Sequence, residues 1–213
     1  MSLEGFPKEI PLVPLAEPLL LPGTVVPFTV HDDGDRHLLQ DALAAQGYVG
    51  IVQPLEGEAE DPPRLYQVGC LGRIGETRED DEGDTVALAG GLVRFRIVAE
   101  VPCDRGYRRA TVDYSEFAED PVEIESELSF AGLRKLVRRR IEENSAEFDL
   151  SIMDRMGGTE IVTAIAHAIP LSPAERQMLM ETPQLASLET VLLQLMAGPG
   201  GVPSFAPQSS LPS

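Results

Sequence analysis

Cysteine, histidine and positive charge are scarce in this sequence. Cys70 and Cys103 are its two cysteines. Two isolated thiols do not make a disulfide framework, so we expect both to be reduced and buried as small core side chains. Lysine and arginine total 17 against 35 aspartates and glutamates, which gives a formal net charge of −18. Phosphate backbones and anionic membrane surfaces attract basic proteins, so we predict neither nucleic acid nor membrane as a partner.

Long apolar runs are absent as well. The most apolar stretch, Ile10 to Val30, is interrupted by five prolines, whereas a membrane-spanning helix needs about 20 apolar residues in a row. Met1 to Glu9 lacks the apolar core of a signal peptide. Because 43% of the 213 residues are hydrophobic, the chain can still bury a core. We therefore expect a soluble, cytoplasmic protein.

The motifs that carry catalysis are missing too. The sequence contains no phosphate-binding loop, no His-Glu-x-x-His and no nucleophile-elbow serine. A Ser–Lys dyad would need a lysine in a protected pocket. Lys8 lies near the terminus, and Lys135 lies on the charged face of a predicted helix. We therefore predict no catalytic residue and no cofactor.

Two acidic segments raise the hypothesis of a metal site. His31 and His37 stand among aspartates, and residues 79–84 are strongly acidic. The first segment is typical of the polar entry to a helix, with Asp33 or Asp35 as the capping residue. The second lacks the ligand spacing of a calcium loop and fits the solvated tip of a hairpin. We therefore predict no metal site.

The pattern of the sequence changes near Asp120. Before it, short β-like runs are separated by glycine and proline, and after it the pattern is helical as far as Ala197. Strands followed by helices predict an α+β fold. We divide the chain into a β domain (1–118), a helical subdomain (119–197) and a Pro- and Ser-rich tail (198–213) that we expect to be disordered.

The first part has one predicted helix among its strands. Asp35 to Gln46 has one apolar face and is followed by Gly47, a typical helix stop. Gly90-Gly91 is expected to break the chain between two strands. Many short strands at this spacing indicate a small barrel or a sandwich. The predicted strands are Ile10–Ala16, Thr24–Val30, Tyr48–Val52, Tyr66–Thr77, Thr85–Ala89, Leu92–Val101 and Arg108–Tyr114.

The strand from Leu92 to Val101 alternates between two faces. Val93 and Phe95 belong to a wholly apolar face that we expect to line a core. Arg94 and Arg96 share the other face. They are candidate anchors for an anionic ligand in a pocket between the strands and the helices. The alternative is an exposed strand face on which both arginines pair with nearby acidic residues.

Four helices are predicted in the second part. Asp120-Pro121 is a capped start for a long helix that ends near Glu143. A second helix covers Thr159 to Ala168. A capping box at Ser172 opens a third, and the fourth runs from Thr182-Pro183 to Ala197.

Two segments are candidates for surface contacts. Arg134 to Arg140 is the one basic cluster. It is a candidate RNA contact or, as the neighbouring glutamates favour, a solvated face that pairs with itself. Leu19 to Phe28 crowds apolar residues between prolines. Such a segment can line a groove or present an edge to an added peptide strand, or it can be plain core.

The order of several short motifs resembles the N-terminal (LON) domain of the ATP-dependent Lon protease. Ile10-Pro-Leu-Val-Pro-Leu15 and Leu21-Pro-Gly-Thr-Val-Val-Pro-Phe28 resemble the opening of that family. Tyr66 to Ile74 resembles its Val-Gly-x-x-Ala-x-Ile strand. Gly91-Leu-Val-Arg-Phe-Arg-Ile97 resembles its most distinctive stretch, Gly-x-x-Arg-Phe-x-Ile.

The resemblance implies both a fold and a function. The implied fold is a PUA-like β-barrel, or pseudobarrel, with one inserted helix, followed by a C-terminal helical bundle. Lon uses this region to engage substrates and to assemble, so the implied function is recognition of polypeptides. Lon continues into an ATPase and a Ser–Lys peptidase, for which this sequence has no motif. We therefore expect a non-catalytic module, an adaptor or regulator in protein quality control, with polypeptides or Lon as partners.

Two other functions stay open at the level of the sequence. One is a small-molecule-binding domain with a pocket between barrel and helices. The other is RNA binding, which rests on the use of PUA-like barrels elsewhere and which the charge of −18 opposes. The family motif does not fix the binding residues. Phe28, Arg94 and Arg96 are our candidates for peptide or ligand contacts.

Overall fold

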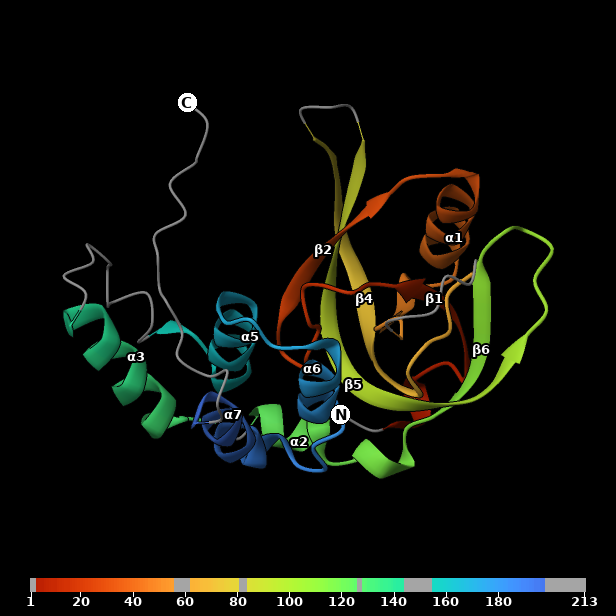
Figure 1. Cartoon of the computed structure of the whole chain (residues 1–213). Coiled ribbons are helices and arrows are strands. Elements are labelled where there is room, and N and C mark those ends of the chain that lie inside the picture. The colour runs from red at the N-terminus through yellow and green to blue at the C-terminus, as the bar shows by residue number, and fades with distance from the viewer. Residues whose placement is uncertain (1–2, 56–61, 81–83, 126–127, 144–154, 198–213) are drawn as a thin grey trace.

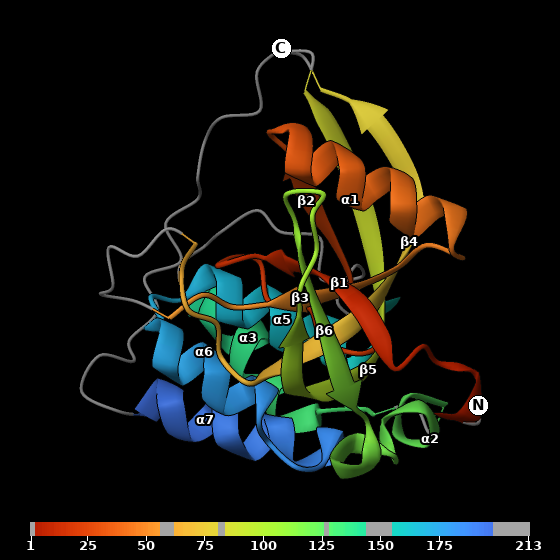
Figure 2. The same cartoon turned by 90° about the vertical axis from the view of Figure 1, so that its right-hand side faces the viewer.

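The computed structural model describes residues 3–55, 62–80, 84–125, 128–143 and 155–197. Within these ranges an irregular, closed sheet stands beside a group of helices (Figure 1). Helix α1 lies on one side of the sheet, and α5, α6 and α7 lie on the opposite side (Figures 1 and 2). The predicted α+β fold with an irregular barrel and one inserted helix is confirmed.

Six strands of the described chain form one sheet in the order β2-β5-β4-β3-β1-β6. β5 also pairs with β6, so β5, β4, β3, β1 and β6 close into a ring. β2 pairs with β5 outside that ring. β1 and β3 are parallel, and the other pairs are antiparallel. The strands are β1 (Glu9–Pro14), β2 (Val25–Val30), β3 (Tyr48–Val52), β4 (Val68–Glu79), β5 (Thr85–Val101) and β6 (Arg108–Asp113).

The longest of these strands, β5, corrects one prediction. Gly90-Gly91 does not break the chain, because β5 runs unbroken through both glycines for 17 residues. One edge of β5 pairs with β4. The other edge pairs with β2 from Thr85 to Gly90 and with β6 from Arg96 to Val101. Strand partners on both edges hold the glycines extended, which a local pattern does not reveal.

A second correction concerns the helix expected from Asp120 to Glu143. The structure has two helices there, separated at Phe130, whose φ of 41° lies in the left-handed region. At this break the carbonyl of Leu128 packs on Gly158, at the start of α5. The described α-helices are α1 (Asp33–Ala44), α2 (Asp120–Glu125), α3 (Ala131–Glu143), α5 (Gly158–Ala168), α6 (Pro173–Met180) and α7 (Leu188–Ala197).

The sequence signals at the helix starts are confirmed in part, because the helix expected from Thr182-Pro183 begins only at Leu188. Ser172 accepts a hydrogen bond from the backbone N–H of Glu175, and the carboxylate of Glu175 accepts from Ser172 N–H, which completes the predicted capping box. For α1 the cap is Asp32 rather than Asp33 or Asp35. Its side chain accepts from Asp35 N–H at 2.8 Å, so the helix begins two residues earlier than predicted.

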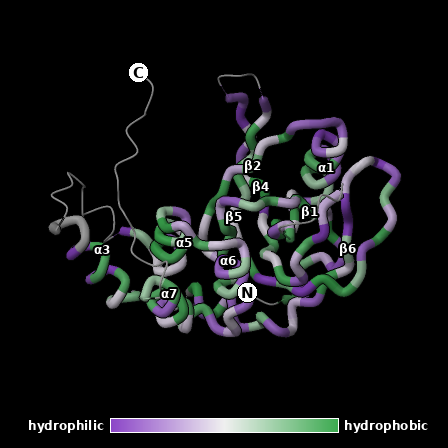
Figure 3. Tube along the Cα trace, viewed as in Figure 1, coloured by the Kyte–Doolittle hydropathy of each residue, from purple (hydrophilic) through white to green (hydrophobic). Residues whose placement is uncertain are grey.

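One continuous core joins the inner face of the sheet to the helices. Val93 and Phe95 are fully buried, as their alternation predicted. The core includes residues of the ring and of the helices, whereas the far end of the β4–β5 hairpin is hydrophilic (Figure 3). Cys70 and Cys103 are both free thiols, the first buried and the second half-buried. Burial raises the pKa of the Cys70 thiol, so it stays protonated.

Two predictions of organisation are not tested. The boundary at 118/119 falls between the last strand and α2, but the division into two domains stays a prediction. The predicted tail, 198–213, lies outside the described residues. Among the described helices, none is long and apolar enough to cross a membrane.

Candidate functional site

The three residues selected from the sequence lie in different surroundings. Phe28 is 5% exposed and packs in the core beneath β2. Arg96 is exposed on β5 and donates two hydrogen bonds to Glu116, from Nε at 2.8 Å and from Nη2 at 3.0 Å. The bond to Glu116 raises the pKa of Arg96. The structure does not bring the three side chains together, and their ligand-binding role stays a prediction.

Arg94 is fully buried at the junction of sheet and helices. It pairs with Asp120, at the start of α2, through Nε at 2.9 Å and Nη2 at 2.6 Å. It also donates to the carbonyls of Met180, the last residue of α6, and of Thr182 and Pro183 just beyond it. An arginine has five N–H donors, and all five are used here. The exposed strand face expected for Arg94 is therefore wrong, although its expected acidic partner exists.

Asp120 also supplies a hydrogen-bond acceptor where β5, within the described chain, has no strand partner on one edge. On the edge of β5 that faces β2 and β6, Arg94 lies between the two paired segments. Its backbone N–H donates to Asp120 Oδ2 at 2.9 Å. A carboxylate thus takes the place of a strand partner, and one side chain satisfies both the backbone and the guanidinium of the same residue. A buried charge needs such full pairing.

The outer face of β2, β5 and β4 carries a hollow of about 550 Å³. Val25, Gly90 and Arg73 stand in one cross-strand row there. Val25 is 64% exposed and forms one wall. Gly75 and Gly90 leave the floor bare, because open space or ordinary van der Waals contact surrounds the place where a Cβ would stand.

These two glycines are not required by the fold. Neither has a positive φ, and a Cβ at either place would meet no close neighbour. Gly91 differs, because a Cβ there would overlap the carbonyl oxygen of Leu21. Glycine inside a strand often marks a place where a ligand or another backbone approaches closely. The hollow over Gly75 and Gly90 therefore has the form of a contact surface.

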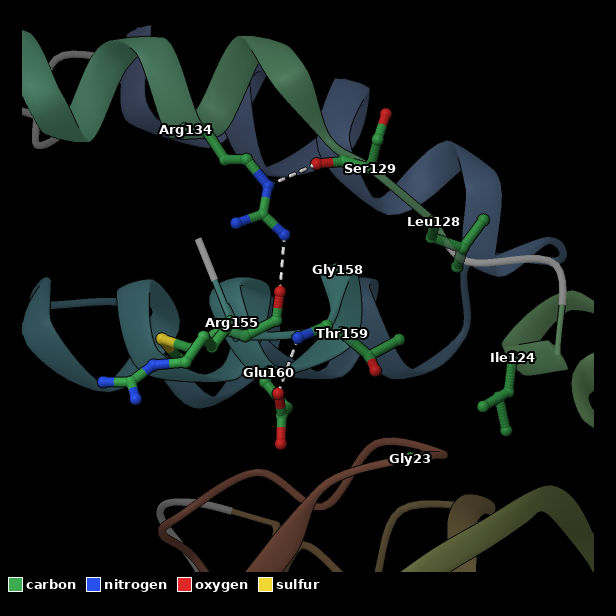
Figure 4. Close-up of a pocket in the computed structure, with 11 residues that line it drawn as sticks. Gly23, Ile124, Leu128, Ser129, Arg134, Arg155, Gly158, Thr159 and Glu160 are labelled. Atoms are coloured by element: carbon green, nitrogen blue, oxygen red, sulfur yellow. Dashed lines mark hydrogen bonds between the residues drawn. The ribbon is translucent and has the colours of Figure 1, made fainter. Parts of the chain in front are cut away.

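A cavity of about 520 Å³ lies between the sheet and the helices (Figure 4). Gly23 borders it from the sheet side, and the first residues of α5 border it from the helix side. Arg134 spans its rim by donating to the carbonyls of Ser129 at 2.6 Å and Met156 at 2.5 Å. Glu160 turns back to accept from Gly157 N–H at 2.6 Å. The cavity lies where the small-molecule alternative expects a pocket, but neither Arg94 nor Arg96 lines it.

The acidic segments that raise the hypothesis of a metal site lie partly in the described part of the chain. No group of three or more His, Cys, Asp or Glu side chains is close enough there to hold a metal ion. His37 Nδ1 lies 3.0 Å from the carbonyl of Arg105, and Asp35 accepts from the backbone of His31. Both histidines therefore take part in a hydrogen bond that involves a backbone group.

The glycines of the hollow are visible in the sequence, but their position on one face of the sheet is not. Gly75 lies on β4, in the register shift between Ile74 and Glu76, and Gly90 lies on the neighbouring strand β5, opposite Arg73. Only the pairing shows that they share an outer face. The sequence did indicate the Leu19–Phe28 segment, whose strand supplies Val25 to the wall.

Comparison with known proteins identifies relatives of this chain. A model of the ATP-dependent protease La (LON) substrate-binding domain matches residues 9–197. Lon protease 2 of Myxococcus xanthus is 28% identical over 210 residues, and Lon protease 2 of Syntrophobacter fumaroxidans is 29% identical over 199 residues. These alignments cover 92% and 90% of this chain but only 24% and 25% of the proteases.

Solved structures share the fold. The N-terminal domain of the Lon protease of the Mycobacterium avium complex superposes with a TM-score of 0.65 at 24% identity. A Lon N-terminal domain protein from Xanthomonas campestris gives 0.61 at 22% identity. The superpositions cover 88% and 89% of this chain and 97% of each solved chain.

Proposed function

Because this chain belongs to the family of ATP-dependent protease La (LON) substrate-binding domains, we propose that it is a non-catalytic module that binds extended polypeptide segments. The observation that carries the proposal is the hollow over Gly75 and Gly90, two glycines on neighbouring strands at which an added Cβ would meet no close neighbour. A bound segment would place an apolar side chain against Val25 and over these glycines.

The proposal is tested by filling the hollow. Binding of a fluorescein-labelled unfolded polypeptide is followed by fluorescence anisotropy. Gly90→Val and Gly75→Val should each weaken binding by about tenfold or more, which corresponds to about 1.4 kcal/mol. Both variants should keep or slightly raise the thermal midpoint of the parent, because the place of each new Cβ has no close neighbour. Unchanged affinity in both variants would remove the hollow from the binding site.

A matched pair of valines supplies the control. Val25 and Val98 are each 64% exposed on strands of the same sheet, but only Val25 borders the hollow. Val25→Ser should weaken polypeptide binding several-fold, and Val98→Ser should leave it unchanged. Equal losses would mean that the polypeptide contacts exposed apolar side chains without preference.

A role in protein quality control belongs to the same proposal. In this view the protein acts in the cytoplasm as an adaptor or regulator, with polypeptides or a Lon protease as partners and without RNA or membrane. The support is the family and the net charge of −18. Purified protein is used to capture partners from a lysate, beside a charge-matched control. Selective enrichment of unfolded or short-lived proteins, or of Lon, is the expected result.

The cavity of Figure 4 supports a second candidate function, binding of a small molecule. Its volume of about 520 Å³ falls within the range of roughly 300–1,000 Å³ that is usual for ligand sites. A ligand found by native mass spectrometry should raise the thermal midpoint. Ser129→Trp, at the exposed rim, should abolish that rise by filling the entrance. A ligand whose binding survives this substitution would lie elsewhere.

A further inference from the structure

β2 lies at an open edge of the sheet. In the part of the chain that the structure describes, its one strand partner is β5. The side chains of Val26 and Phe28 point inward and are buried, whereas Val25 and Pro27 are exposed. The strand is therefore anchored on one side by the core and by β5, while its other edge faces away from the ring.

The backbone of β2 presents unused hydrogen-bonding groups along that edge. Gly91 N–H donates to the carbonyl of Thr24 at 2.8 Å, so the backbone of Thr24 is directed toward β5. Direction alternates along an antiparallel strand, so the backbones of Val25, Pro27 and Thr29 are directed away from β5. No hydrogen bond between described residues engages the N–H or C=O of Val25 or Thr29 on that side.

Proline at the middle of this edge fits the same geometry. Pro27 has no N–H, and proline is tolerated in a sheet where the nitrogen faces away from a partner strand. An edge of this kind is a template for a further strand. Val25 and Thr29 each offer a donor and an acceptor, and Pro27 offers an acceptor. Val25 is also the wall of the hollow, so edge and hollow are continuous.

We infer that a polypeptide segment binds by strand addition to the open edge of β2, and that an alternating apolar segment with basic flanks is the preferred class. The inference rests on the proposed polypeptide-binding function and specifies how the segment is held. Backbone bonds to Val25 and Thr29 provide affinity without sequence preference. Side chains on alternate positions then lie beside Val25 or beside the buried face of β2.

Charge supports the choice of basic flanks. The C-terminal end of β2 leads into Asp32 and Asp33, both exposed. Val30 is in register with Thr85, which places Asp84 at the same end of the strand. Arg36 pairs with Asp33, and the whole chain carries a net charge of −18. A cationic residue beside this end gains attraction, and the overall field speeds its approach.

The test uses the labelled peptide KVTVTFTVK and two N-methylated versions. One carries N-methyl groups on the odd-numbered residues, and the other carries them on the even-numbered residues. Successive N–H groups of an extended peptide point to opposite edges, so each version blocks hydrogen bonding along one edge. Strand addition predicts that one version loses at least about tenfold in affinity, whereas the other binds like the parent. Equal affinity, or equal loss, of the two versions overturns the inference.

A second arm changes the protein. Thr29→Pro removes the outward N–H of the edge and should weaken binding several-fold, whereas Thr29→Val keeps that N–H and should bind normally. Amide exchange and the thermal midpoint check that both variants fold. Equal binding by the two variants contradicts strand addition. The peptide EVTVTFTVE should bind more weakly than KVTVTFTVK at low salt, and equal affinities there would refute the basic preference.

The outcomes separate the inference from the proposed function. If unfolded polypeptide binds and is blocked by Gly90→Val, but KVTVTFTVK does not bind, strand addition is wrong and the hollow alone is the site. If neither probe binds to the parent protein, the proposed function fails, and strand addition fails with it.

Discussion

The two halves of β5 are built differently, although they belong to one unbroken strand. From Arg96 to Val101 the strand pairs with β6, while its pairing with β4 ends at Arg96, and the sheet closes. From Thr85 to Gly90 it lies between β4 and β2, beyond which the sheet has an open edge. The closed half packs beside the junction with the helices. The open half ends at Gly90, where an added Cβ would meet no neighbour closer than 3.9 Å.

This difference shows how one strand can serve both stability and recognition. Arg94 and Asp120 stand at the transition and tie the strand to α2 and to the end of α6. The closed half can therefore hold the open half in place without covering it. Binding sites are more precise when rigid elements carry them. The comparison predicts large stability effects at the transition and small ones in the hollow.

The largest loss of stability is expected from breaking the Arg94–Asp120 pair, which lies where the two halves of β5 meet. Arg94→Met leaves Asp120 buried without its partner, and removal of one member of a buried pair typically costs about 3–5 kcal/mol. Urea unfolding should show this loss. The double variant Arg94→Met/Asp120→Leu should recover part of it, because no unpaired charge remains, although the backbone N–H of residue 94 loses its acceptor. A loss below about 1 kcal/mol for Arg94→Met would contradict the assigned role.

The next effect separates two adjacent glycines of β5. In Gly91→Ala the new methyl group would overlap the carbonyl of Leu21, so we expect a loss of about 1–3 kcal/mol, as for other overpacked positions. In Gly90→Ala the methyl group points into the hollow, and we expect a gain of roughly 0.4–1 kcal/mol, because the unfolded chain loses freedom. Thermal unfolding of both variants measures the contrast. Equal losses would mean that the hollow is not open.

The sequence alone predicts the parts of this comparison that depend on local pattern. The alternation of Val93 and Phe95 predicted the buried face, and Ser172 predicted the start of α6. The continuity of β5 through Gly90-Gly91 was missed, because the strands that hold the glycines extended are distant in sequence. The setting of Arg94 was missed for the same reason, since its acceptors at Asp120 and Met180 lie 26 and 86 residues away.

A smaller effect is expected at the start of α6, the helix whose end receives Arg94. Ser172→Ala removes the hydroxyl that accepts from Glu175 N–H and should cost about 1 kcal/mol, as is usual for a lost cap. Hydrogen bonds from the N–H and hydroxyl of Ser172 lower the pKa of Glu175. A lowered carboxyl pKa contributes stability above its unfolded value, and that stability is lost as the pH falls.

The pKa of Glu175 in variants of Ser172 provides the control for this prediction. In Ser172→Ala the pKa of Glu175, followed by NMR titration, should move back toward its ordinary value, because the hydroxyl donor is gone. Ser172→Thr keeps the hydroxyl and should restore both the stability and the low pKa. An unchanged pKa in Ser172→Ala would show that the backbone N–H alone holds the carboxylate.

The smallest effect is expected two residues beyond Arg94, on the same strand. Arg96 and Glu116 form a pair of the same chemistry, but their side chains are 44% and 41% exposed. Water and salt screen an exposed pair, so Arg96→Met should cost less than about 1 kcal/mol and should cost even less in high salt. Urea unfolding at two salt concentrations measures this beside Arg94→Met. Similar losses of unfolding free energy for the two variants would mean that burial does not determine how much such a pair contributes to stability. A small loss would leave Arg96 available as a candidate polypeptide contact, because the fold would not depend on its present partner.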